Sequence, residues 1–312
     1  MTSDLIRLGM VRLTDAAPLV LAQTNGLFEA AGLRTTISVE PSWANIADKL
    51  AWNLLDGAIM LHPLAIAMAL GLRGPPARLL IAAGISRHGN AITLARPLAD
   101  ALPDGNLATL ATRKLRLAIV HAFSTHDMLL RRFLQDGGID PERDVEITVV
   151  PPPDMPHALR SGRIDGFCAG APWGAVADRM GAGRTVALGS AIWPGHAEKC
   201  LVLRRDWADA DPALRADLQV ALHTAGLQCD DPATTPELAA LLSRPEWLGV
   251  SAKLIATSLP GSMGSVSDRS LFAAQDAMAV SPAEGRDFLR LIAHRWPLPA
   301  DAEAIVAALY TG

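Results

Sequence analysis

The chain has 312 residues, of which 50% are hydrophobic, 19% are charged and 4% are aromatic, and its formal net charge is -4. This composition excludes a disordered chain, which has fewer apolar and more charged residues. The slightly acidic balance argues against direct binding of nucleic acid, which usually needs a basic excess. The length is sufficient for two lobes of ordinary domain size.

The cysteines and the N-terminus predict the compartment. Cys168, Cys200 and Cys229 are too few and too widely spaced for a disulfide framework, which favours a reducing environment. The first residues lack the basic and apolar regions of a signal peptide. The longest apolar stretch, residues 58–72, is too short for a membrane span and contains His62 and Pro63. We therefore expect a cytoplasmic protein that makes no membrane contact.

The first two thirds of the chain alternate between short apolar, β-branched runs and segments with helical spacing. The runs predict strands at 5–10, 35–39, 58–61, 78–83, 115–120, 145–150, 164–169 and 185–188. Helices are expected at 16–31, where Thr14-Asp15 is a plausible N-cap pair, and at 44–55, 64–72, 125–136, 154–161 and 172–180. Strands separated by single helices favour parallel sheets with helices on both faces.

The alternation forms two series, at about 5–85 and 115–190, and residues 86–113 between them predict a crossover from one lobe to the other. After residue 206 the pattern is helical, with helix starts expected near Pro212, Pro236, Pro282 and Pro299. The fold class is therefore α/β, with two lobes and a helical C-terminal part. Ligands of such proteins bind at the carboxyl ends of the strands, close to helix N-termini.

Two residues follow directly after predicted strands. Trp43 comes after the strand at 35–39, where it either packs in the core or offers its indole N–H to a ligand. Asn90 follows Gly89, and is either a turn residue or a donor in the cleft.

The segment 124–127 lies between a predicted strand and a predicted helix. Thr125 is a natural N-cap, which places His126 at the first helical position, where backbone N–H groups favour an anion. Neighbouring Ser, His and Asp residues cannot form a catalytic relay, and His121 with His126 lacks a third metal ligand. A structural helix-cap histidine is the simpler alternative.

Further candidates are Trp173, which either lines the cleft or packs beneath it, and Lys199. This chain uses Arg six times as often as Lys, so a lysine here is a weak indication of a small anion, which suits a compact ammonium group. The chain contains no GxGxxG, P-loop, GxSxG or paired CxxC motif. These residues favour binding over catalysis.

Several of these segments together resemble the nitrate- and bicarbonate-binding proteins of cyanobacterial ABC transporters. The resemblance covers about residues 8–207 and includes Leu13-Thr14-Asp15-Ala16-Ala17-Pro18-Leu19, Ser42-Trp43-Ala44, Thr125-His126-Asp127, Gly137-Gly138-Ile139-Asp140-Pro141, Val149-Val150-Pro151-Pro152-Pro153, Pro172-Trp173, His196-Ala197-Glu198-Lys199 and Arg205-Asp206-Trp207. It implies a two-lobed clamshell of the periplasmic-binding-protein type (type II). Residues 1–88 and 200–312 would form lobe I, and residues 89–199 lobe II.

The resemblance also implies a site. In the nitrate-binding branch a Trp, an amide, a His and a Lys contact the anion, and they correspond to Trp43, Asn90, His126 and Lys199. The family's acidic residue before Pro-Trp is Ala171 here. Loss of this carboxylate favours nitrate or nitrite over bicarbonate with a metal. We expect a ligand site of Trp43, Asn90, Thr125, His126, Ala171, Trp173 and Lys199, with no metal and no cofactor.

Without a leader, the chain resembles most closely the cytoplasmic nitrate/nitrite sensors of the NasS type. That resemblance implies a NasT-type antiterminator, an RNA-binding response regulator, as the partner that nitrate releases. The alternative is a nitrate-binding subunit of an ABC transporter. An enzyme of the related thiamine-precursor type would need a reactive cleft nucleophile, and Cys168 lies in the middle of a predicted strand, where a core role is the better interpretation.

Overall fold

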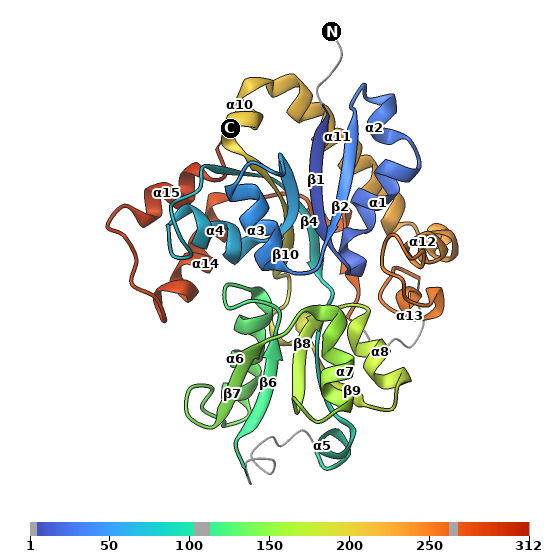
Figure 1. Ribbon diagram of the computed structural model, residues 1–312, viewed down its shortest axis with the longest axis vertical. Helices are drawn as coiled ribbons and strands as arrows, with labels where there is room; N and C mark the ends of the chain where they lie inside the picture. The colour runs from blue at the N-terminus through green and yellow to red at the C-terminus, as the bar shows by residue number, and fades with distance from the viewer. Residues whose placement is uncertain (1–4, 103–112, 262–267, 312) are drawn as a thin grey trace.

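The computed structural model describes residues 5–102, 113–261 and 268–311. It contains two β-sheets, each with its own helices, which lie one above the other in Figure 1. The first sheet has the order β11-β4-β10-β3-β1-β2. Its strands are β1 (Ile6–Val11), β2 (Thr35–Glu40), β3 (Gly57–Leu61), β4 (Leu79–His88), β10 (Ala197–Arg204) and β11 (Ser270–Leu271).

The second sheet has the order β7-β6-β8-β5-β9. It is formed by β5 (Asn90–Ala95), β6 (Leu115–Ile119), β7 (Val145–Val149), β8 (Gly166–Gly170) and β9 (Gly183–Leu188). The α/β class with two lobes is confirmed, and the chain changes sheet at Gly89 and again between β9 and β10. Residues 197–199 therefore lie in a strand of the first sheet.

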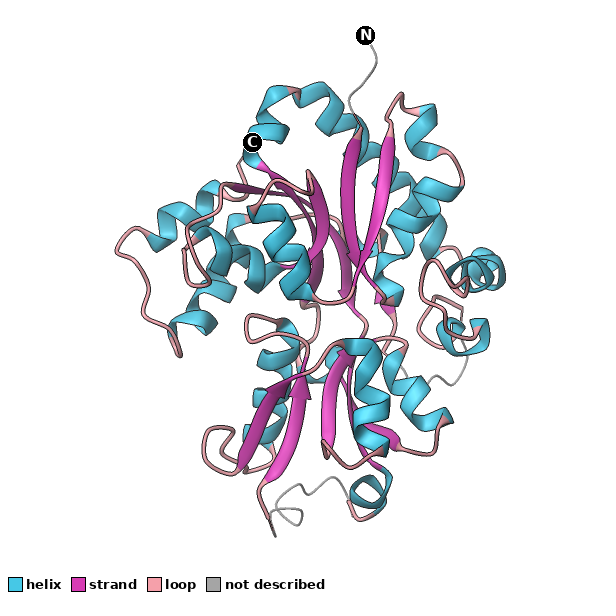
Figure 2. Ribbon diagram, in the orientation of Figure 1, coloured by secondary structure: helices cyan, strands magenta, loops and turns pink. Residues whose placement is uncertain are grey.

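Helices surround both sheets (Figure 2). They are α1 (Ala17–Thr24), α2 (Leu27–Ala30), α3 (Trp43–Ala51), α4 (His62–Ala69), α5 (Arg96–Asp100), α6 (Thr125–Asp136), α7 (Met155–Arg160), α8 (Trp173–Arg179), α9 (Gly189–Ile192), α10 (Arg205–Ala210), α11 (Pro212–Asp230), α12 (Thr235–Leu242), α13 (Ala252–Ala256), α14 (Pro282–Ala293) and α15 (Ala302–Ala308). The helical C-terminal part is thus present, and its helices pack on the first sheet's lobe (Figure 1).

The first sheet is buried on both faces. Along β3, Ala58 and Met60 face the core that contains α3, α4 and α14, whereas Ile59 faces the core that contains α1 and α11. Successive strand residues point to opposite faces, so a strand covered on both sides must be apolar throughout. This explains why β3 reads as a continuous run of small and aliphatic residues.

Two expectations about the elements are corrected. The sheets are mixed, because β10 runs antiparallel to β3 and β4, and β5 antiparallel to β8 and β9. The helix expected at 16–31 is two helices, broken at Gly26, whose φ of 69° is left-handed. The crossover expected within 86–113 is confirmed, because the chain passes at Gly89 from β4 of the first sheet to β5 of the second; residues 103–112 of this segment lie outside the described part.

No helix among the described residues is both long and apolar enough to cross a bilayer.

Candidate functional site

Lys199, on β10, is completely buried between two carboxylates. Its Nζ lies 2.9 Å from Asp15 Oδ2 and 2.5 Å from Glu198 Oε1. It also lies 5.4 Å from the centre of the Trp43 ring, within the range of a cation–π contact. Burial alone would lower the pKa of Lys199, but attraction by Asp15 and Glu198 outweighs burial and raises it. Lys199 is therefore a fixed buried cation.

A β-bulge brings Glu198 and Lys199 together. Neighbouring strand residues normally point to opposite faces, but Ala197 pairs with Arg87 while Lys199 pairs with Ser86, so Glu198 is an extra residue in this ladder. Burial would raise the pKa of Glu198, yet Lys199 and the nearby histidines lower it to about 2. Glu198 thus remains ionised beside Lys199.

Two histidines flank the Glu198 carboxylate. His126 Nδ1 lies 3.6 Å from Glu198 Oε1, and His196 Nε2 lies 3.8 Å from Glu198 Oε2. Burial lowers the pKa of His126 to about 3, despite the attraction of Glu198, so His126 is neutral at pH 7. Lys199 Nζ and His126 Nδ1 therefore both face the same oxygen, Glu198 Oε1. We call Asp15, His126, His196, Glu198 and Lys199 the central cluster.

Four of the expected site residues carry buried polar atoms that make no hydrogen bond within the protein. They are Trp43 Nε1, Asn90 Nδ2 and Oδ1, Thr125 Oγ1, and both ring nitrogens of His126. Buried polar atoms of native proteins almost always have a hydrogen-bond partner, so several orphans on neighbouring residues indicate that a ligand supplies the partners.

Asn90 is linked to the central cluster through Gly170. A Cβ atom on Gly170 would lie 3.4 Å from Asn90 Oδ1 and 3.5 Å from Asp15 Oδ2. The side chains of Asn90 and Asp15 therefore both approach the Cα of Gly170, and a larger residue at this position would crowd them.

Ala171 and Trp173 hold the two lobes together. The amide N–H of Thr14 donates to the carbonyl of Ala171 at 2.8 Å, and the indole N–H of Trp173 donates to the carbonyl of Arg12 at 2.9 Å. The donor expected from Trp173 is therefore already used between the lobes. A role for either residue in contacting a ligand stays a prediction.

The start of α6 differs by one residue from expectation. Ser124 is the N-cap, because its hydroxyl accepts from the amide of Asp127 at 3.0 Å, and Thr125 is the first helical residue. His126 is consequently the second helical residue. It still lies in the first turn, where unpaired N–H groups favour negative charge.

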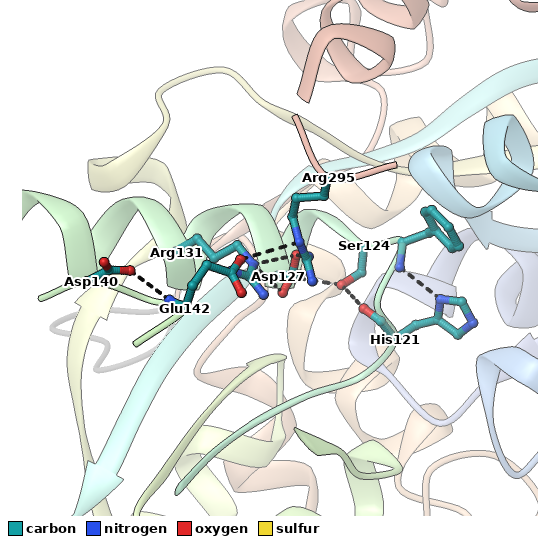
Figure 3. Close-up of polar contacts among 8 residues, drawn as sticks. His121, Ser124, Asp127, Arg131, Asp140, Glu142 and Arg295 are labelled. Carbon is teal, nitrogen blue, oxygen red and sulfur yellow. Dashed lines mark hydrogen bonds and ion pairs between the residues drawn. The ribbon is translucent and has the colours of Figure 1, made fainter. Parts of the chain in front are cut away.

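A second charged network fixes this turn of α6 (Figure 3). Asp127 accepts hydrogen bonds from Arg131 at 2.9 Å, and Arg131 donates to Glu142 at 2.6 Å. Arg295, from the segment after α14, donates to Asp127 at 2.5 Å. Because Arg295 belongs to the first sheet's lobe and α6 to the second, this α6 cluster of Asp127, Arg131, Glu142 and Arg295 ties the lobes together beside His126.

Sequence reasoning missed the acidic half of the central cluster. Asp15 is no helix cap, since Ala16 is the N-cap of α1 and Asp15 pairs with Lys199 instead. Glu198 was not among the expected site residues, although it lies next to Lys199. The replacement of a family carboxylate by Ala171 therefore does not leave the cleft without carboxylates. The adjacent Glu-Lys pair in a buried strand was the one available signal, because such a pair must be neutralised internally.

The described residues contain no group of three or more His, Cys, Asp or Glu side chains placed to hold a metal ion. Cys168 is buried in β8, and burial raises the pKa of its thiol well above its usual value. A neutral, inaccessible thiol is a poor nucleophile.

Comparison with known proteins identifies the family. The model of the NMT1-like family matches residues 2–243. The chain belongs to the NMT1-like family. It is 33% identical over 273 residues to the nitrate/nitrite binding protein NrtA of Synechococcus elongatus, covering 82% of this chain and 62% of NrtA.

Two further relatives extend the comparison. The nitrate import ATP-binding protein NrtC of a Synechocystis strain is 38% identical over 260 residues, which cover 80% of this chain but 38% of NrtC. The chain thus spans about two fifths of that relative. The crystal structure of the periplasmic nitrate-binding protein NrtA from Synechocystis superposes with a TM-score of 0.91 at 26% identity, covering 99% of this chain and 86% of that one. The expected periplasmic-binding-protein-like fold is confirmed, and the NMT1-like chain is homologous to NrtA, which is named a nitrate/nitrite binding protein.

The names of these relatives bear on the expected role as a cytoplasmic sensor. NrtA and NrtC are named for nitrate binding and nitrate import, which supports the alternative of a transporter subunit more than that of an antiterminator-controlling sensor. The particular closeness to cytoplasmic sensors, and the NasT-type partner, stay predictions without support from these relatives.

Proposed function

We propose that this NMT1-like protein binds nitrate or nitrite between its two lobes and is the binding component of an ABC-type importer. The observation that carries the proposal is the set of buried, unpartnered polar atoms on Trp43, Asn90, Thr125 and His126 beside the cation Lys199. Homology to NrtA, itself named for nitrate and nitrite, supports the choice of anion.

Nitrate is a planar monoanion whose oxygens accept only weak hydrogen bonds. Its burial therefore requires several converging donors. The indole of Trp43, the amide of Asn90 and the hydroxyl of Thr125 would each supply one, while the first turn of α6 adds partial positive charge. Hydrogen bonds to a charged group contribute about 1.5–3 kcal/mol each, so three or four are sufficient for micromolar affinity.

Calorimetric titration with nitrate, nitrite and bicarbonate tests the ligand. We expect nitrate or nitrite to bind at micromolar concentration. Thr125→Val should weaken nitrate binding about tenfold, because it removes one donor of about 1.4 kcal/mol. Thr93→Val is the matched control, since Thr93 also carries a buried, unpartnered hydroxyl but lies on β5 against Gly174. Binding of bicarbonate alone, or equal effects of the two variants, would refute the proposed ligand or site.

The importer role needs a second assay. When the protein is added to vesicles that contain the cognate membrane and ATP-binding subunits, nitrate should increase ATP hydrolysis. Purification with an antiterminator that nitrate displaces would replace the importer role by that of a sensor, while leaving the ligand unchanged.

A further inference from the structure

The one positive charge of the central cluster is already paired with carboxyl groups before any ligand arrives. Lys199 faces two carboxyl groups, Asp15 and Glu198, and all three side chains are buried. A monoanion placed beside them would add negative charge to a site from which water is excluded. An uncompensated buried charge is costly, so a further positive charge has to accompany the anion.

The position of His126 shows where that charge can reside. Its Nδ1 faces Glu198 Oε1 at 3.6 Å, and its Nε2 is buried without a partner. A neutral imidazole has one N–H, so it can donate to one acceptor only. An anion at Nε2 would place an acceptor at each ring nitrogen, and only the doubly protonated ring can donate to both.

We propose that the anion binds together with one proton, which is held on His126 between Glu198 and the anion. This inference rests on the proposed function. The proton comes from solvent, no electron is transferred, and the net charge of the site is the same before and after binding. The protein thus binds the oxyanion and one proton together, and the proton resides on His126.

The groups around His126 agree with this assignment. Glu198 and Lys199 approach from β10, His196 from the segment before it, and Asp127 follows on α6. Asp127 is occupied by Arg131 and Arg295. His196 is the second histidine that faces Glu198. Its Nδ1 carries a hydrogen, because it lies 2.7 Å from the carbonyl of Trp193, and its Nε2 faces Glu198 Oε2.

The unliganded protein has to acquire the proton during binding. Burial lowers the pKa of His126 to about 3, so the ring is neutral at pH 6.5 without ligand. Anion binding raises that pKa. Affinity therefore falls as pH rises through the interval between the unliganded and the liganded pKa, by about tenfold per pH unit for one proton.

Calorimetry with nitrate in MES and bis-Tris buffers at pH 6.5 measures the protons taken up. Nitrate is the right probe because it holds no proton of its own at this pH. The wild type should take up about one proton per nitrate, and its affinity should fall about tenfold from pH 6 to pH 7. His126→Gln, which keeps an N–H donor but cannot titrate, should bind nitrate more weakly without proton uptake. His196→Gln should retain the uptake.

The outcomes separate the two proposals. Nitrate that binds the wild type with no proton uptake overturns the inference and leaves the proposed function intact. Uptake that persists in His126→Gln, or that disappears only in His196→Gln, overturns the assignment to His126. If His126→Gln does not fold, the proton uptake of the wild type and the pH dependence of its affinity still decide whether the anion binds together with a proton. If the wild type binds no nitrate in either buffer, the proposed function fails and this inference fails with it.

Discussion

The central cluster and the α6 cluster are two charged networks that lie next to each other at the contact of the lobes, and they differ in how their polar atoms are paired. In the α6 cluster each charged side chain has an opposite charge within 2.9 Å, and the network reaches solvent through Glu142, which is 67% exposed. In the central cluster His126 and Glu198 keep unpartnered atoms, although both are fully buried. Complete pairing is typical of a structural role, whereas several buried unpaired groups on neighbouring residues indicate a binding role.

The largest expected effect comes from removing the buried cation. Lys199→Met leaves Asp15 and Glu198 buried without a counter-charge, which should lower the free energy of unfolding by about 3–5 kcal/mol. Urea denaturation measures this change. Adding Asp15→Asn to the variant should recover part of the loss, since one uncompensated carboxylate is removed. A decrease in the free energy of unfolding below about 1 kcal/mol would contradict full burial of the central cluster.

Trp43→Phe tests the binding role directly. The substitution keeps an aromatic ring near Lys199 but removes the unpartnered indole N–H, so nitrate affinity should fall roughly 10- to 100-fold, the equivalent of about 1.5–3 kcal/mol. Calorimetric titration provides the measurement. Trp52→Phe is the control, because Trp52 is 70% exposed and should not affect binding. Equal affinities of the two variants would contradict a ligand contact at Trp43.

The pH dependence of stability sharpens the comparison. The pKa of His126 is depressed to about 3 in the folded protein but is near 6.5 in the unfolded chain, so the unfolded chain binds the proton first as pH falls. Ligand-free stability should therefore decline from pH 6.5 towards pH 3, with one proton contributing up to about 1.4 kcal/mol per pH unit.

His62 and His121 contribute in the same direction, since burial lowers the pKa of each to about 4. His126→Gln should reduce the slope by one proton without abolishing it. Urea melts at several pH values test this, and an unchanged slope in the variant would mean that His126 is charged in the folded protein.

The smallest effect is expected in the α6 cluster. Arg295→Ala removes one of two arginines from Asp127, and Arg131 remains, so the free energy of unfolding should fall by no more than about 1 kcal/mol. Because Arg295 bridges the lobes, nitrate affinity should fall a few-fold as the open form gains population. Small-angle scattering measures the opening. Arg132→Ala, which affects an exposed pair within α6, is the control without effect on either quantity.

The sequence predicted most strands and helices of the two lobes to within a few residues, because their periodicity is local. It did not reveal that β5 and β10 run antiparallel to their neighbours, since the partners of a strand are decided by the path of the whole chain rather than by its own residues. The same limit applied to the binding site. Lys199 and His126 could be named from their segments, but Glu198 could not be placed between them. Its orientation depends on a bulge against β4, which no pattern within β10 indicates.

The return of the chain at Gly89 has a mechanical consequence. Asn90 follows directly on Gly89, one of the two points at which the chain passes from one sheet to the other, so a rotation of the lobes about this point would displace Asn90 little. Trp43 begins a helix beside the first sheet and His126 lies in the first turn of a helix beside the second, so such a rotation would move them apart. An anion bound by both Trp43 and His126 would therefore hold the two lobes together. Asn90 would contribute to selectivity for the shape of the anion and little to closure of the lobes.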